Sequence, residues 1–107
     1  MSMQPWSLVG QLAAVRYSVL ADADPGLLAR LIQPFARRDL APDSFTAERR
    51  GDAMRAEIAM ERMPAEMVHL VEGNLRQVVG VVSVTVRQEI TGSVRRQAAK
   101  GSKAFFF

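Results

Sequence analysis

The stretch DADPGLLARLIQPFARRDL, residues 22–40, decides the fold of this chain. Asp24 and Pro25 are typical of a helix start, because an Asp side chain accepts a hydrogen bond from a first-turn amide and a Pro at the first helical position loses no bond. Five apolar residues then recur at helical spacing, namely Leu27, Leu28, Leu31, Ile32 and Phe35. We therefore expect a turn and an amphipathic helix from Pro25 to Arg38, kinked at Pro34 rather than divided there.

The Asp-Pro-Gly turn is also the best candidate for a binding site. Gly26 has no side chain, so another backbone or a small ligand can approach the first helical turn closely. Asp24 is expected to cap the helix, whereas Asp22 either contributes to a ligand site or is simply solvated. The turn thus has a structural role and is the first place to look for a ligand.

The chain length allows one small domain. Its 107 residues include no Cys, which excludes disulfides, thiolate metal sites and cysteine nucleophiles. No apolar run approaches the ~20 residues that cross a membrane, and residues 1–9 lack the positive head of a secretory signal. We therefore expect a cytoplasmic protein without membrane contact.

The net charge of +3 is unevenly distributed. Basic and acidic residues balance over residues 1–88, and the excess lies in residues 89–107. A high isoelectric point of this origin says little about what the folded part binds. We divide the chain into an N-terminal arm (1–10), a folded domain (11–88) and a basic flexible tail (89–107).

The remaining segments alternate between strand and helix patterns. Apolar and polar residues alternate as in strands over residues 11–21, 44–50, 53–61 and 80–88. Gly51-Asp52 is a two-residue hairpin signal between the second and third strands. A second helix is expected from Pro64, with an apolar stripe of Met67, Leu70, Val71, Leu75 and Val78. The order is therefore strand, helix, strand, strand, helix, strand.

This order predicts an α+β fold, the ferredoxin-like βαββαβ sandwich. Right-handed crossovers place both helices on one face of a four-stranded antiparallel sheet with strand order 4-1-3-2. The strand over residues 44–50 is then an exposed edge, which pairing across a twofold axis would protect. We therefore expect a homodimer.

The chain is poor in catalytic groups. His69 is its only histidine, and no second His or carboxylate makes a convincing metal pair with it. No phosphate-binding loop, dinucleotide fingerprint or nucleophile motif is present. We expect no cofactor and no catalysis, with a small enzyme using His69 as the alternative. RNA-binding modules of this fold stack bases on exposed aromatics of both central strands, and only Tyr17 is available, so we expect no nucleic acid.

The chain resembles ACT domains, small amino-acid-sensing regulatory modules of ferredoxin-like fold, at residues 24–30 (DPGLLAR) and 35–38 (FARR). It is most similar to the regulatory (small) subunits of acetolactate synthase, whose first helix begins Gly-Ala-Leu-Ser-Arg and continues to a Phe and an Arg. The order of elements agrees over about residues 11–88.

The resemblance implies an effector such as valine or another amino acid, bound at the turn after the first strand and against the first helix of a partner. A carboxylate would meet free amides near Gly26, and an ammonium group would meet an Asp of the turn. In the synthase subunits an Asn that helps hold the effector stands at the position of Ala41, and an Asn is usual at that of Ala23. The candidate ligand-binding residues are Asp22, Ala23, Asp24, Pro25, Gly26, Leu27, Leu28 and Ala41.

The function that follows is that of a non-catalytic, amino-acid-sensing regulatory subunit. Its partner would be the catalytic subunit of an acetolactate-synthase-like, thiamine-diphosphate-dependent enzyme in branched-chain amino acid biosynthesis. The homodimer would form through the sheet edge and the first helix. The alternative is a ligand-free protein–protein interaction module of the same fold.

Overall fold

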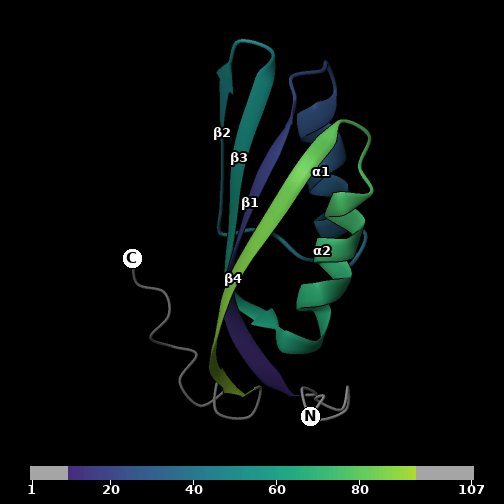
Figure 1. The fold of residues 1–107 in the computed structure, drawn as a ribbon. Coiled ribbons are helices and arrows are strands. Elements are labelled where there is room, and N and C mark those ends of the chain that lie inside the picture. The colour runs from purple at the N-terminus through teal and green to yellow at the C-terminus, as the bar shows by residue number, and fades with distance from the viewer. Residues whose placement is uncertain (1–9, 94–107) are drawn as a thin grey trace, which may run out of the picture.

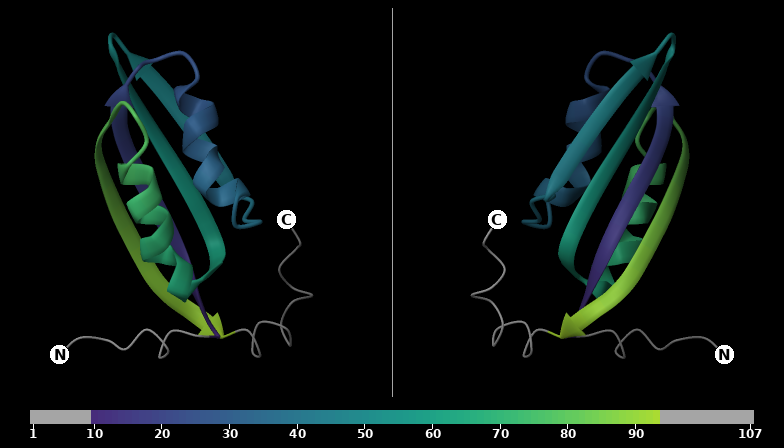
Figure 2. Two further views of the ribbon diagram at one scale, coloured as in Figure 1. Left: turned by 90° about the vertical axis from the view of Figure 1, so that its right-hand side faces the viewer. Right: turned by 90° about the vertical axis from the view of Figure 1, so that its left-hand side faces the viewer.

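The computed structural model describes residues 10–93. The elements there are β1 (Gln11–Asp22), α1 (Leu27–Ala36), β2 (Ser44–Arg50), β3 (Ala53–Pro64), the 3-10 helix η2 (Ala65–Met67), α2 (Val68–Arg76) and β4 (Val81–Ser93). The strands form one antiparallel sheet in the order β2-β3-β1-β4, which confirms the predicted ferredoxin-like topology (Figure 1). Both helices cover one face of the sheet and leave the other face open (Figure 2).

The core lies between the helices and the sheet, and β1 runs through its centre. β1 pairs with β3 on one side and with β4 on the other. Tyr17 of β1 is fully buried, and its hydroxyl donates a hydrogen bond to the carbonyl oxygen of Val68 (2.7 Å). Its ring meets that of Phe35 edge to face, with centroids 5.7 Å apart. Tyr17 therefore joins β1 to both helices and is not exposed on the sheet.

The first helix is one element but shorter than expected. α1 begins at Leu27 and ends at Ala36, rather than spanning Pro25 to Arg38. It continues through Pro34. The buried residues of α1 are Leu27, Leu31, Pro34 and Phe35. The apolar stripe is therefore confirmed on the face that meets the sheet.

The expected side-chain cap at Asp24 is wrong. The carboxylate of Asp24 accepts no hydrogen bond from the first turn of α1, and it lies 3.9 Å from the guanidinium of Arg30. The backbone starts the helix instead. The N–H of Leu27 donates to the carbonyl of Asp24 (3.1 Å), and Gly26 occupies the cap position with a φ of 83°, which glycine adopts without strain.

The second helix begins later than expected. Pro64 ends β3 instead of opening a helix, and α2 starts at Val68 after η2. Val68, Val71 and Leu75 are buried, whereas Leu70 is 54% exposed. The predicted stripe was therefore right at Val71 and Leu75, wrong at Leu70, and it missed Val68.

The hairpin follows the prediction, and the last strand does not. β2 has the predicted bounds, and Gly51-Asp52 forms the turn into β3. β4 continues to Ser93 rather than ending at Gln88. Residues 1–9 and 94–107, which include most of the expected arm and tail, lie outside the described residues. Within residues 10–93, none of the helices has the length and apolar character needed to cross a membrane.

Candidate functional site

The turn between β1 and α1 is held by two neighbouring loops. The N–H of Asp22 donates to the carbonyl of Gly80 in the α2–β4 loop (2.8 Å). The N–H of Ala23 donates to the carbonyl of Asp52 in the β2–β3 hairpin (2.9 Å), and that of Asp24 turns back to the carbonyl of Asp22 (2.9 Å). Two loops that are far apart in sequence thus fix one short turn.

The start of α1 leaves backbone donors unpaired. The first bond of the helical ladder runs from the N–H of Arg30 to the carbonyl of Gly26 (3.1 Å). Within residues 10–93, the amides of Gly26, Leu28 and Ala29 have no hydrogen-bond acceptor. Free amides at a helix N-terminus attract a carboxylate or another anion.

Charged groups of both signs stand beside these donors. The guanidinium of Arg30 lies 3.9 Å from the carboxylate of Asp24 and donates to the carbonyl of Val79 (3.4 Å). The Nε atom of Arg30 is buried and has no hydrogen-bond partner in the described part of the chain. The packing is close, since a Cβ atom at Gly26 would lie 3.3 Å from Nη1 of Arg30, and one at Gly80 would lie 3.2 Å from Oδ2 of Asp24.

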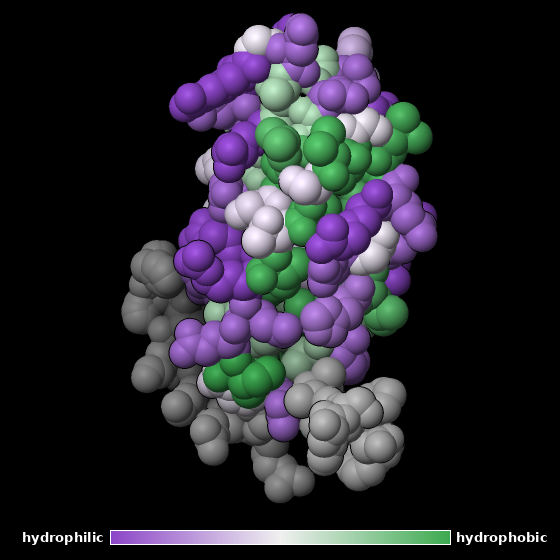
Figure 3. Space-filling model, viewed as in Figure 1, coloured by the Kyte–Doolittle hydropathy of each residue, from purple (hydrophilic) through white to green (hydrophobic). Residues whose placement is uncertain are grey.

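Exposed apolar side chains flank the turn. Leu28 is 40% exposed, Val79 74% and Val82 66%. Figure 3 shows hydrophobic residues gathered over the upper part of β4 and the adjoining loop. Pro25 is exposed at the tip of the turn, whereas the side chain of Leu27 is buried in the core. An aliphatic group of a ligand or a partner chain would find apolar surface here.

Ala41 does not join the other candidates. It follows α1, and the nearby N–H of Asp43 donates to the carbonyl of Ala59 (2.8 Å). Ala59 pairs with Arg16 of β1, so this segment lies beside Arg16. Asp22 is six residues beyond Arg16 on the same strand, which at roughly 3.3 Å per residue is a distance of about 20 Å. Within one chain, the other seven candidates form the turn, and Ala41 lies near the opposite end of α1.

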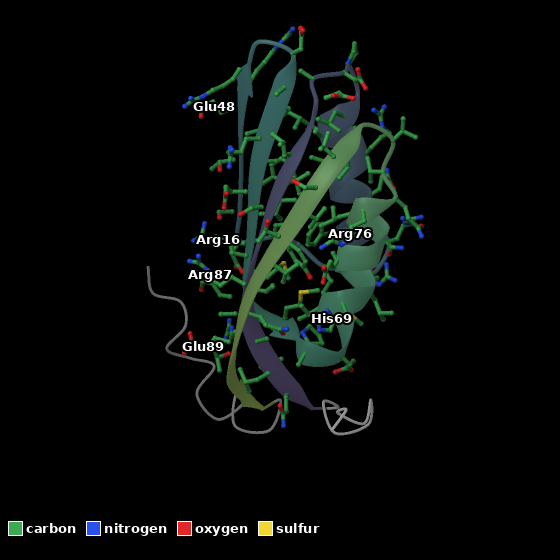
Figure 4. All side chains as sticks on the ribbon, in the orientation of Figure 1. Arg16, Glu48, His69, Arg76, Arg87 and Glu89 are labelled. Carbon is green, nitrogen blue, oxygen red and sulfur yellow. The ribbon has the colours of Figure 1, made fainter. Side chains whose placement is uncertain are left out.

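His69 lies away from the turn on α2 (Figure 4). Its side chain is 70% exposed, and its Nδ1 atom is 3.1 Å from the carboxylate of Glu72. Arg76 donates to the same carboxylate (2.7 Å), and this hydrogen bond, aided by His69, holds the pKa of Glu72 below its usual value. Arg76 also donates to the carbonyl of Val84 in β4 (2.7 Å). The described residues include no group of three or more His, Cys, Asp or Glu side chains that could hold a metal ion.

Arg30, Val79 and Gly80 complete the turn, and the sequence analysis did not select them. Gly80 has a φ of 96° directly before β4, so a glycine at a strand start was the available signal. Nothing in the sequence spacing relates it to the first turn. The pairing of β1 with β4 brings the two loops together.

Comparison with known proteins gives a consistent family and fold. The family profile described as ACT-like domain matches residues 10–92. The crystal structure of the ACT domain from GTP pyrophosphokinase of Chlorobium tepidum is similar, with a TM-score of 0.61 and 12% identity over 72% of this chain and 99% of that one. The C-terminal domain of the MgtC protein from Mycobacterium tuberculosis has a TM-score of 0.57 and 16% identity over 77% and 93% of the two chains. The search of curated protein sequences found no match.

Proposed function

Because the chain belongs to the ACT-like domain family, whose ACT domains are regulatory and non-catalytic modules, we propose that it is a regulatory domain that binds an amino acid at the β1–α1 turn. One observation carries the proposal. Within residues 10–93, the amides of Gly26, Leu28 and Ala29 have no hydrogen-bond acceptor. The same turn contains two acidic residues, Asp22 and Asp24. This arrangement offers donors to a carboxylate and acceptors to an ammonium group.

The flanking surface favours an aliphatic amino acid. Leu28 and Val79 expose apolar side chains at the turn. A side chain such as that of valine would cover part of this surface, and burial of apolar area would contribute to affinity. The partner's first helix, as the family resemblance implies, would cover the rest.

Regulation would operate by linkage. An effector that binds one arrangement of the dimer better than another shifts the population toward that arrangement, and the partner enzyme responds to the shift. The most specific form of the proposal has the catalytic subunit of an acetolactate-synthase-like, thiamine-diphosphate-dependent enzyme as that partner. The similarity of residues 24–30 and 35–38 to the synthase regulatory subunits supports it, and co-purification from the native cell tests it.

Calorimetric titration of the intact protein with each of the twenty amino acids tests the turn site. We expect heat with an aliphatic amino acid and a dissociation constant about tenfold higher in the variants Asp22→Asn and Asp24→Asn, which each remove a negative charge that would attract the ammonium group. Glu66→Gln is the matched control, because Glu66 is exposed on η2, away from the turn. Unchanged affinity in both Asp variants would show that the ligand binds elsewhere.

The second candidate function is a ligand-free interaction module. The exposed edge of the sheet favours it, since every residue of β2 except Phe45 is exposed. A row of free backbone groups at such an edge can pair with another chain. Absence of heat with all twenty amino acids at millimolar concentrations, together with capture of a partner that depends on β2, would favour this module over the amino-acid sensor.

A further inference from the structure

The open face of the sheet carries two arginines directly opposite each other. Arg16 on β1 pairs with Arg87 on β4, next to each other across the two strands. Like charges at directly opposed positions repel and destabilise a sheet. Figure 4 shows both side chains projecting from the face that the helices leave uncovered.

Protein groups do little to neutralise this pair. The guanidinium of Arg16 is 3.8 Å from the carboxylate of Glu57 and 55% exposed, so the contact is loose. That carboxylate accepts a shorter hydrogen bond from the hydroxyl of Ser18 (2.9 Å). In the described part of the chain, Arg87 makes no side-chain hydrogen bond or ion pair. The two guanidinium groups therefore retain donors for an external oxyanion.

The surface beside the arginines is hollow because its floor is built of small residues. A depression of about 370 Å³ is lined by Ala14 and Ala59 together with both arginines. Ala59 of β3 pairs with Arg16, and Ala14 precedes Arg16 by two residues on β1. Methyl groups at these two positions leave space between the longer side chains of the neighbouring strands.

Carboxylates form the opposite wall of the depression. Glu61 and Glu89 line it, and Glu89 pairs with Ala14 across β1 and β4. Asp43, a third lining residue, accepts a hydrogen bond from the N–H of Glu61 (2.6 Å). The three carboxylates would repel a simple anion that binds the arginines, and they suit a positive group on the same ligand.

We propose that this face binds a small zwitterionic molecule, with its oxyanion group between Arg16 and Arg87 and its ammonium group toward Glu61 and Glu89. Guanidinium forks bind carboxylate and phosphate groups in the same two-pronged manner, so either can supply the oxyanion. Arg87 and Glu89 are two residues apart on β4, so the positive and negative parts of the site are separated by roughly 7 Å. This spacing favours a molecule whose charges are several bonds apart, such as a dipeptide.

This site does not rest on the function proposed for the turn. Asp22 and Arg16 are about 20 Å apart along β1, and the turn lies at the end of the strand rather than on its open face. Substitutions at one place therefore report on it without touching the other. Failure of either proposal leaves the other standing.

Titration followed by two-dimensional NMR of the intact protein tests the proposal with three probes. Glycylglycine is a zwitterion, its N-acetyl derivative is an anion only, and phosphoethanolamine carries a phosphate in place of the carboxylate. We expect glycylglycine or phosphoethanolamine to shift the backbone resonances of Arg16, Ala59 and Arg87, and the stronger of the two identifies the oxyanion. The N-acetyl derivative should bind at least about tenfold more weakly than glycylglycine, because it lacks the charge that the carboxylates recognise.

Variants separate this site from general charge attraction. Arg16→Gln and Arg87→Gln should each raise the dissociation constant about tenfold. Arg55→Gln should leave it unchanged, since Arg55 lies on the same face of β3 but does not line the depression. No shift with any probe at millimolar concentrations, equal binding of the N-acetyl derivative, or equal loss in Arg55→Gln would overturn the proposal. Resonance shifts of Arg16 and Arg87 that follow protein concentration without any probe would also overturn it, because a second copy of the chain would then occupy the face.

Discussion

Tyr17 is the residue on which the core most depends. It is fully buried, it touches both helices, and its hydroxyl makes the 2.7 Å hydrogen bond to the carbonyl of Val68. Burial also raises the pKa of Tyr17 above its usual 10.0. The folded state therefore retains the phenolic proton at a pH at which the unfolded chain releases it.

The variant Tyr17→Phe should lower the free energy of unfolding at pH 7 by about 1 kcal/mol, because it removes one buried hydrogen bond and keeps the ring. In the native protein the contribution of Tyr17 is fully present below pH 10 and declines as the pH rises above it, since only the unfolded state then loses the proton. Urea unfolding at pH 7 and at pH 11 measures both effects. Between pH 7 and pH 11, Tyr17→Phe should lose less free energy of unfolding than the native protein. Ser18→Ala, which removes a partly buried hydroxyl on the opposite face, is the control. An alkaline loss equal in Tyr17→Phe would contradict the assignment.

Single residues also show where local sequence rules fail. The rule for Asp before Pro predicted a side-chain cap at Asp24, yet the carboxylate lies beside Arg30. Gly26, with its φ of 83°, already turns the backbone into the helix and leaves the carboxylate available. Asp24 was identified correctly as part of the turn, but its role was decided by Gly26 and by Arg30, which follows it by six residues.

At the scale of elements, periodicity predicted what lies in the middle of the fold. The apolar stripe of α1, the alternation of β3 and the Gly51-Asp52 hairpin were all readable, because each buries one face against the core. The ends of elements were not readable. Pro64 was compatible with either a strand end or a helix start. Residues 89–91 are exposed and Gly92 follows them, so this segment shows no strand pattern and becomes a strand because β1 is there to pair with it.

The edge strand β2 supplies a prediction about assembly. If two β2 strands pair across a twofold axis, the central residue Ala47 lies close to its own copy. The variant Ala47→Lys would place two positive charges near each other, and it should raise the dissociation constant of the dimer at least about tenfold. Sedimentation equilibrium measures this constant.

The control for that experiment is Gln77→Lys, an exposed site at the C-terminal end of α2, outside both the β2 edge and the first helix, where a positive charge suits the helix dipole. Circular dichroism should show the same fold for both variants. An unchanged dimer in Ala47→Lys would exclude β2 as the interface and direct attention to the other edge strand, β4.

At the scale of the whole molecule, the candidate site depends on contacts that no sequence window contains. Residues 22–28 were identified as one turn, but the carbonyls that hold it come from Asp52 and Gly80. Ala41, which the family resemblance added, lies about 20 Å along the sheet. The open-face depression was not predicted at all, because the pairing of Arg16 with Arg87 follows from the register of β1 and β4.

The division of the candidate residues leads to a prediction about the complete assembly. If a twofold dimer brings the turn of one chain against the first helix of its partner, the effector contacts both chains and must bind the dimer better than the monomer. Effector binding and dimerisation are then coupled by one free energy, so each strengthens the other by the same factor.

For valine, or the amino acid that gives heat in calorimetry, we expect a coupling of about tenfold. Sedimentation equilibrium with and without saturating effector gives the factor for dimerisation. Calorimetry of the native protein, and of Ala47→Lys at concentrations where sedimentation shows that this variant is monomeric, gives the factor for binding. Equal factors above one would establish a site completed by the dimer, whereas a dimer dissociation constant that does not respond to the effector would confine the site to a single chain.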